Sequence, residues 1–198
     1  MKLEPALEDK GVLIALAATA HHAIASEGAT IPNLIIGHGI VGRLIARIAI
    51  ALGADAPLVW EKNATRRDGA LGYHVVDPAD DPRRDYHAIC DASGDPLLLD
   101  ILFSRLAKRG EITLAGFYET PLSFTFPPAF MREARFRIAA EWARADIDAV
   151  MDLILSGTLS LEGLVTNHST PHHAQEAYRT AFTDPTCLKM ILDWREAA

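Results

Sequence analysis

Three glycines at fixed spacing are the residues of this chain best suited to bind phosphates. They follow the apolar run Leu34–Ile36 and open a stretch that repeats apolar residues every four positions. In a strand–turn–helix unit the first glycine allows a tight turn, the second admits a pyrophosphate, and the third lets the helix pack closely on the strand. The helix N-terminus adds unpaired N–H groups. The predicted pyrophosphate contacts are Gly37, Gly39, Ile40, Val41 and Gly42.

A carboxylate at the end of the next apolar run is the second candidate. Leu58–Trp60 is typical of a strand, and Glu61 follows it, about 20 residues beyond the glycines. An acid at this place can accept hydrogen bonds from the ribose diol of NAD, whereas it would repel the 2′-phosphate of NADP. The nearby cations Lys62, Arg66 and Arg67 could instead accept that phosphate. Because Glu61 ends the strand itself, NAD is the predicted cofactor, with Glu61 and Lys62 among its contacts.

Composition narrows the class of protein. The chain has 198 residues, 49% of them apolar, and a net charge of −7 without any basic run, which gives no reason to expect nucleic acid as a partner. Two cysteines, Cys90 and Cys187, cannot form a disulfide framework, and they favour a reducing cytoplasm. The apolar run 11–20 is too short to span a membrane, and Glu8 and Asp9 precede it where a signal peptide carries positive charge. A buried helix over 11–25 is predicted instead, with no integral membrane segment.

Strands and helices are predicted to alternate after this helix. The predicted strands are 34–36, 58–61, 74–77, 86–91, 111–115 and 135–140, and the predicted helices are 39–52, 96–110 and 146–156. Asp95 and Pro96 would begin the second of these helices as its N-cap and first residue. Such alternation predicts an α/β fold with a doubly wound, parallel six-stranded Rossmann sheet.

The last part of the chain follows a different plan. A short strand at 164–166, a helix from Thr170 and Pro171, and a final strand at 188–194 are predicted there. Because six strands already complete the sheet, these elements are interpreted as a small strand–helix–strand remnant of a second domain. The predicted division is a leading helix at 1–30, an NAD-binding domain at 31–160 and a C-terminal segment at 161–198.

Histidines and two strand-end loops are the remaining candidates. Asp91-Ala92-Ser93 and Gly116-Phe117-Tyr118 follow the fourth and fifth strands, at the carboxyl edge where such sheets bind ligands. His168, His172 and His173 are close in sequence, and His21 precedes His22, but neighbours in a first helical turn point apart by about 100°. No metal site is predicted, because zinc needs three or four converging ligands.

Several longer stretches together match one family. They are 37–42, 59–63, 91–95, 114–118, 126–135, 187–190 and 192–195, and 126–135 is much more specific than the glycine motif. These stretches resemble the bacteriochlorophyllide a dehydrogenases, a family of the medium-chain dehydrogenase/reductase superfamily. The resemblance covers the chain from about residue 11.

The resemblance implies an activity and further contacts. Family members oxidise the 3-hydroxyethyl group of a bacteriochlorophyllide to 3-acetyl by hydride transfer to NAD, in bacteriochlorophyll biosynthesis for photosynthesis. It implies that Asp91, Ala92 and Ser93 border the adenine-side pocket, and that Thr19, Gly116 and Phe117 lie near the nicotinamide. Ala15 stands where zinc-binding relatives have a cysteine ligand. His22 and Tyr118 are the candidates for a catalytic proton relay.

The resemblance also bears on domains and assembly. Family members carry a GroES-like catalytic domain before the helix matched by 11–25, so the chain is expected to be the cofactor-binding portion and to be inactive or weakly active alone. Superfamily dimers join their sheets through the sixth strand, and 135–142 predicts a homodimer of that kind. Two alternatives stay open: a non-catalytic NAD(H)-sensing module, and a methyltransferase with a similar glycine turn.

Overall fold

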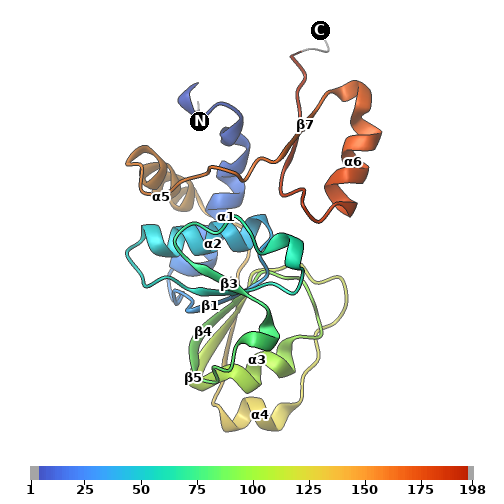
Figure 1. Cartoon of the computed structure of the whole chain (residues 1–198). Helices are drawn as coiled ribbons and strands as arrows, with labels where there is room; N and C mark the ends of the chain where they lie inside the picture. The colour runs from blue at the N-terminus through green and yellow to red at the C-terminus, as the bar shows by residue number, and fades with distance from the viewer. Residues whose placement is uncertain (1–4, 196–198) are drawn as a thin grey trace.

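The computed structural model describes residues 5–195 and contains a parallel six-stranded sheet (Figure 1). All pairings within the sheet are parallel. From β1 the strand order runs outward in one direction to β2 and β3 and in the opposite direction to β4, β5 and β6. Open α/β sheets bind ligands at such a reversal, here between β1 and β4. The predicted doubly wound Rossmann sheet is therefore confirmed. In sheet order the strands are β3 (His74–Val76), β2 (Leu58–Trp60), β1 (Leu34–Ile36), β4 (Tyr86–Asp91), β5 (Leu106–Leu114) and β6 (Arg135–Ile138).

Helices cover both faces of the sheet and create two cores. Figure 1 shows α1, α2 and α5 on one side and α3 and α4 on the other. In β1 the side chain of Ile35 joins the first core, while Leu34 and Ile36 join the second, as the alternation of a strand buried on both faces requires. No helix within residues 5–195 is long and apolar enough to cross a membrane. The helices are α1 (Ile14–Ala25), α2 (Ile40–Ala51), α3 (Leu99–Arg105), α4 (Phe126–Met131) and α5 (Arg144–Leu155).

The leading helix packs closely because its side chains are small. Ala17, Ala20 and Ala23 are fully buried, and α1 contacts both α2 and α5. The predicted helix at 11–25 is confirmed, although its first three residues belong to a 3₁₀ segment, η1 (Pro5–Leu13), that precedes α1.

The helix predicted at 96–110 is shorter than its sequence pattern indicates. It begins at Leu99, and the Asp95 side chain instead accepts a hydrogen bond from the backbone N–H of Leu97. The helix ends at Arg105 because Leu106 adopts an extended conformation and pairs with Tyr86 of β4. The predicted helix end at residue 110 is therefore wrong, since β5 already runs through Gly110 after an irregularity in its pairing with β4.

The edge of the sheet differs from prediction in one element. The Pro- and Phe-rich segment before β6, for which no helix is predicted, contains the short helix α4. The strand β6 then pairs with β5 alone, so it is the edge strand, as predicted.

The C-terminal segment forms a separate two-stranded parallel sheet. The strand predicted at 164–166 lies at 167–169 instead, because Leu164 is fully buried in the first core rather than paired in a sheet. The strand–helix–strand order is confirmed. Its elements are β7 (Asn167–Ser169), η4 (Pro171–His173), α6 (Ala174–Thr183) and β8 (Met190–Leu192). The division into 1–30, 31–160 and 161–198 stays a prediction, and residues 1–4 and 196–198 lie outside the described residues.

Arginine side chains attach this C-terminal segment to the rest of the chain. Arg47 of α2 donates to the carbonyl oxygens of Ser160 and Glu162 at 3.0 and 2.8 Å, and Arg66 donates to that of Pro185 at 2.6 Å. Arg43 and Arg47 of α2 are only 6% exposed. Their guanidinium groups donate to backbone carbonyl oxygens, although Nε of Arg47 is buried without a hydrogen-bond partner among the described residues.

Candidate functional site

Each glycine of the motif meets a different steric condition in the turn between β1 and α2. Gly37 has φ +93°, a left-handed conformation that favours glycine. A Cβ on Gly42 would lie 2.0 Å from the Gly37 carbonyl oxygen, so only glycine allows α2 to lie this close to the turn. A Cβ on Gly39 would meet nothing within 4 Å, which leaves open space in front of the helix N-terminus. These are the steric conditions that the predicted pyrophosphate contacts need, and the contacts themselves stay a prediction.

A cavity of about 240 Å³ opens beside this turn at the carboxyl ends of β1, β2 and β4. Gly37 and Gly39 line it together with two of the predicted loop residues, Ala92 and Ser93, and with Glu61 and Lys62. The sequence therefore identified six of its lining residues as site residues. The remaining lining residues are Ile36, Trp60, Arg66, Pro78, Asp95, Leu98 and Ile101.

The carboxylate of Glu61 is held in place by two backbone N–H groups. The N–H of His38 donates to Oε2 at 3.0 Å, and that of Asn63 donates to Oε1 at 2.8 Å. The residue is 7% exposed. Because a carboxylate offers about four acceptor positions, two remain for a ligand in the cavity. Glu61 can thus accept hydrogen bonds from a diol without rearranging.

The cations near Glu61 are directed to other acceptors. The Lys62 Nζ lies 3.3 Å from Asp95 Oδ2, and Arg66 donates to the Pro185 carbonyl oxygen. Arg67 donates to the carbonyl oxygens of Glu61 and Lys62 and pairs with Asp77. Of the three, Lys62 and Arg66 line the cavity and Arg67 does not.

Asp91 shapes the loop after β4 from inside. It is 1% exposed, and its Oδ1 accepts hydrogen bonds from the backbone N–H and the hydroxyl of Ser93, at 2.8 and 2.6 Å. Its Oδ2 is buried without a hydrogen-bond partner among the described residues. Burial, only partly offset by the Ser93 hydrogen bonds, raises the pKa of this carboxyl. Asp91 therefore supports Ser93 and does not itself line the cavity.

The loop after β5 packs tightly against the loop after β4. A Cβ on Gly116 would lie 2.7 Å from the backbone nitrogen of Gly94, so the two backbones touch. Phe117 is 88% exposed, and neither Gly116 nor Phe117 lines the cavity. Burial and the neighbouring Asp91 carboxylate raise the pKa of Tyr118 far above its usual value. A phenol in this state keeps its proton, which makes Tyr118 a poor base.

The structure places the other proton-relay candidate, His22, in hydrogen-bond contact with a carboxylate that it shares with His21. The Nδ1 atoms of His21 and His22 each lie 2.8 Å from one carboxylate oxygen of Asp146, at the start of α5. Burial tends to raise the pKa of Asp146, but hydrogen bonds from the Ala143 N–H and both imidazoles outweigh this and lower it. Since the ionised carboxylate only accepts, Nδ1 of His22 carries a proton and Nε2 of the neutral ring is left as an acceptor. Thr19, one turn earlier, donates to the Ala15 carbonyl oxygen.

The three C-terminal histidines do not converge. His168 of β7 pairs with Asp9 at 2.9 Å, while His172 and His173 lie in η4. Within residues 5–195 no group of three or more His, Cys, Asp or Glu side chains is placed to hold a metal ion.

The sequence did not identify His38 as a contributor to the site. His38, at a variable position of the glycine motif, is fully buried and bonded to the loop after β2. A histidine between two motif glycines was the available signal. Trp60 lines the cavity beside Glu61; it donates through Nε1 to Asp81 at 2.8 Å, and the Arg105 guanidinium stacks on its ring.

The chain is similar over its whole length to two curated dehydrogenases. It is 59% identical over 198 residues to a protein of Cereibacter sphaeroides and 58% identical over 196 residues to one of Rhodobacter capsulatus. Each is named 2-desacetyl-2-hydroxyethyl bacteriochlorophyllide A dehydrogenase. The matches cover 100% and 99% of this chain, which spans 62% of the length of either relative. The resemblance indicated by the sequence is thereby confirmed.

The fold is shared with solved dehydrogenase structures. A crystal structure of a short chain alcohol dehydrogenase from Escherichia coli CFT073, complexed with cofactor NADH, matches with a TM-score of 0.84 at 19% identity. The match covers 97% of this chain and 61% of that one. No protein-family model matches the chain.

Proposed function

We propose that the chain binds NAD(H) at the glycine turn and serves as the cofactor-binding portion of a dehydrogenase that oxidises the hydroxyethyl group of a bacteriochlorophyllide to an acetyl group. The observation that carries the proposal is the turn itself: glycine is required at positions 37 and 42, and open space lies in front of Gly39. The identity of 59% to a bacteriochlorophyllide dehydrogenase supports the substrate class.

Different residues of the cavity would contact different parts of a bound dinucleotide. The turn and the N-terminus of α2 offer N–H groups to the pyrophosphate. Glu61 accepts from the adenosine ribose diol, and the cavity continues between Ser93 and the apolar side chains of Leu98 and Ile101, which suit an adenine ring. When bound, the nicotinamide supplies the chemistry of a hydride acceptor.

NAD is preferred to NADP because of charge. A 2′-phosphate near Glu61 would face a fixed carboxylate, a repulsion of about 4 kcal/mol per charge pair at 4 Å in an intermediate dielectric. The hydroxyl of NAD instead gains a charge-assisted hydrogen bond of about 1.5–3 kcal/mol. The two backbone N–H donors that hold Glu61 in place favour this arrangement.

The alcohol loses a proton as well as a hydride, and His22 is the better placed of the two candidates to accept it. Asp146 fixes the tautomer that leaves Nε2 as an acceptor, and the negative charge would stabilise the imidazolium that forms. Tyr118 is disfavoured because its raised pKa keeps the phenol protonated at neutral pH.

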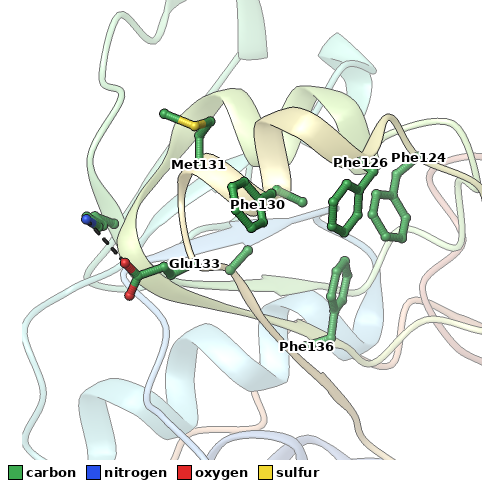
Figure 2. Close-up of a pocket in the computed structure, with 9 residues that line it drawn as sticks. Phe124, Phe126, Phe130, Met131, Glu133 and Phe136 are labelled. Atoms are coloured by element: carbon green, nitrogen blue, oxygen red, sulfur yellow. Dashed lines mark ion pairs between the residues drawn. The ribbon is translucent and has the colours of Figure 1, made fainter.

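A homodimer through β6 is proposed from the exposed edge of the sheet. Ile138 is 76% exposed on a strand that has a free edge, and Phe136 opens into a groove of about 650 Å³ beside α4. Figure 2 shows the rings of Phe124, Phe126 and Phe136 gathered at one end of this groove. Pairing with a second copy would continue the ladder and cover these side chains.

The reducing cytoplasm predicted from Cys90 and Cys187, both unpaired, stays a prediction.

A titration with NADH tests the proposal. Trp60 lines the cavity, so its emission should fall as NADH binds, whereas S-adenosylmethionine should leave it unchanged. In Gly39→Val a branched side chain enters the open space, and NADH binding should weaken at least tenfold while the fold is retained. Equal NADH affinity of this variant and the wild type would refute the site.

A further inference from the structure

The side chain of His38 joins the glycine turn to the segment after β2. It is fully buried, its Nδ1 lies 2.6 Å from the carbonyl oxygen of Arg66, and its Nε2 lies 2.8 Å from the hydroxyl of Tyr73. A carbonyl oxygen only accepts, so Nδ1 carries the proton and Nε2 accepts from the tyrosine hydroxyl. One neutral imidazole thus bonds to two residues of this segment, which runs from Glu61 to Tyr73.

A second residue of α2 holds the same segment. Arg43 donates to the carbonyl oxygens of Arg66 and Asp68 at 3.0 and 2.7 Å, and its Nε donates to that of His38. The Arg66 carbonyl therefore receives two donors from the turn and its helix. Gly69 fits here because it has φ +81° and because a Cβ would lie 2.6 Å from the Arg43 guanidinium. The backbone of residues 66–69 is consequently fixed against the cofactor-binding turn.

This segment after β2 carries three of the charged side chains that line the cavity. Glu61 lies at its start with two of its acceptor positions occupied, and Lys62 and Arg66 are directed to Asp95 and Pro185. The anion is thus presented to the ligand at a fixed place, while both cations are engaged elsewhere. This arrangement suits a free 2′-hydroxyl, which donates to the carboxylate. It disfavours a 2′-phosphate, which would meet the carboxylate and find both cations engaged.

We propose that His38 is a specificity-determining positioning residue, which favours NAD over NADP by holding segment 61–73 so that Glu61 faces the ribose and Arg66 does not. The inference rests on the proposed dinucleotide site and adds to it the device that sets selectivity. The histidine does not touch the cofactor through its side chain. It acts through the Arg66 backbone, and its backbone N–H also holds Glu61.

Removing the imidazole should relax the choice of cofactor. In His38→Leu the new side chain fills the space of the imidazole without its hydrogen bonds. The Arg66 carbonyl loses one of its two donors, and the Tyr73 hydroxyl loses its acceptor. The segment can then move, and Arg66 can exchange the Pro185 carbonyl for a phosphate oxygen, its stronger partner. The ratio of the dissociation constants for NADPH and NADH should fall about tenfold, a change typical of one charge-assisted hydrogen bond.

The test is a pair of fluorescence titrations, with NADH and with NADPH, on the full 198-residue chain. Wild type should bind NADH more than tenfold more tightly, and His38→Leu should lose most of this preference. His38→Asn keeps a donor for the Arg66 carbonyl and should retain most of it. Val150→Ala removes volume from a fully buried site on α5 and should leave the ratio unchanged.

Each outcome has a defined meaning. An unchanged ratio in His38→Leu, or an equal loss in Val150→Ala, overturns the inference. A wild type that binds both nucleotides equally overturns it too, yet leaves the dinucleotide site standing, whereas binding of neither refutes the proposed function. If His38→Leu does not fold, Tyr73→Phe is the deciding variant, since it removes the hydrogen bond from the tyrosine hydroxyl to the imidazole. The ratio of the NADPH and NADH dissociation constants should then fall about threefold. An unchanged ratio in Tyr73→Phe also overturns the inference.

Discussion

Acid should destabilise the folded chain through His38 in a way that a single substitution removes. Burial, aided by the nearby Arg43 and Arg47 charges and opposed by the Arg66 hydrogen bond, lowers the pKa of His38 from 6.5 to about 4. Below pH 6.5 the unfolded chain takes up a proton that the folded chain refuses. The contribution of His38 to stability is thus complete above pH 6.5, and it is lost as the pH falls to about 4.

The size of the effect follows from linkage. One pKa unit corresponds to about 1.4 kcal/mol, so the full shift is worth about 3 kcal/mol, of which about 2.5 kcal/mol is lost between pH 7.5 and 4.5. The His38 side chain is 0% exposed, so burial is the main cause of the lowered pKa. Protonation of carboxyl groups such as Asp146, whose pKa is lowered in the folded chain, also reduces the free energy of unfolding in acid. This loss is the same in wild type and variant.

The assay is urea-induced unfolding of wild type and His38→Leu at pH 7.5 and 4.5, followed by circular dichroism. The free energy of unfolding of the wild type should fall by about 2.5 kcal/mol more than that of the variant over this interval. If both proteins lose the same stability within about 0.5 kcal/mol, His38 is not held neutral by its surroundings, and the hydrogen-bond assignment at Nε2 is wrong.

Further predictions concern the turn, the cofactor, the edge strand and turnover. Gly42→Ala should destabilise the fold by about 3 kcal/mol or more in urea unfolding because its Cβ meets backbone, whereas Gly39→Ala should cost less than about 1 kcal/mol. Glu61→Ala should lower the preference for NADH over NADPH about tenfold in calorimetry, and an unchanged preference would place the ribose contact elsewhere. Ile138→Glu should convert a dimer into a monomer in light scattering; a monomeric wild type at micromolar concentration would contradict the edge-strand interface. The purified chain should form NADH from a hydroxyethyl bacteriochlorophyllide at least about 100-fold more slowly than the Cereibacter sphaeroides relative, and any residual rate should fall in His22→Gln; equal rates would refute this.

The alternation of strands and helices could be predicted because its signals are local. The glycines at 37, 39 and 42, the apolar runs before them and after them, and the acid at 61 each satisfy a steric or electrostatic rule that involves only near neighbours. The edge strand was identifiable for the same reason, since alternation without proline marks a strand wherever it pairs.

What was missed depends on partners distant in sequence. Leu106 leaves the helical pattern only because Tyr86 offers a strand to pair with, 20 residues upstream. Leu164 has the sequence of a strand residue but is drawn into the core between α1, α2 and α5. Arg43 and Arg47 look solvated on a helical projection, and they are buried because loop carbonyls reach them. Local patterns cannot anticipate such tertiary contacts.

The bonds from Arg47 to the carbonyl oxygens of Ser160 and Glu162 have a consequence for local opening. If the C-terminal segment detached while the sheet stayed folded, a guanidinium that is 6% exposed would lose its acceptors, at a cost of about 1.5–3 kcal/mol. Three leucines, Leu159, Leu161 and Leu164, would leave the first core at the same time. Amide protons of residues 159–164 should therefore exchange with solvent on the timescale of α2 itself, and the segment should behave as part of the same cooperative unit.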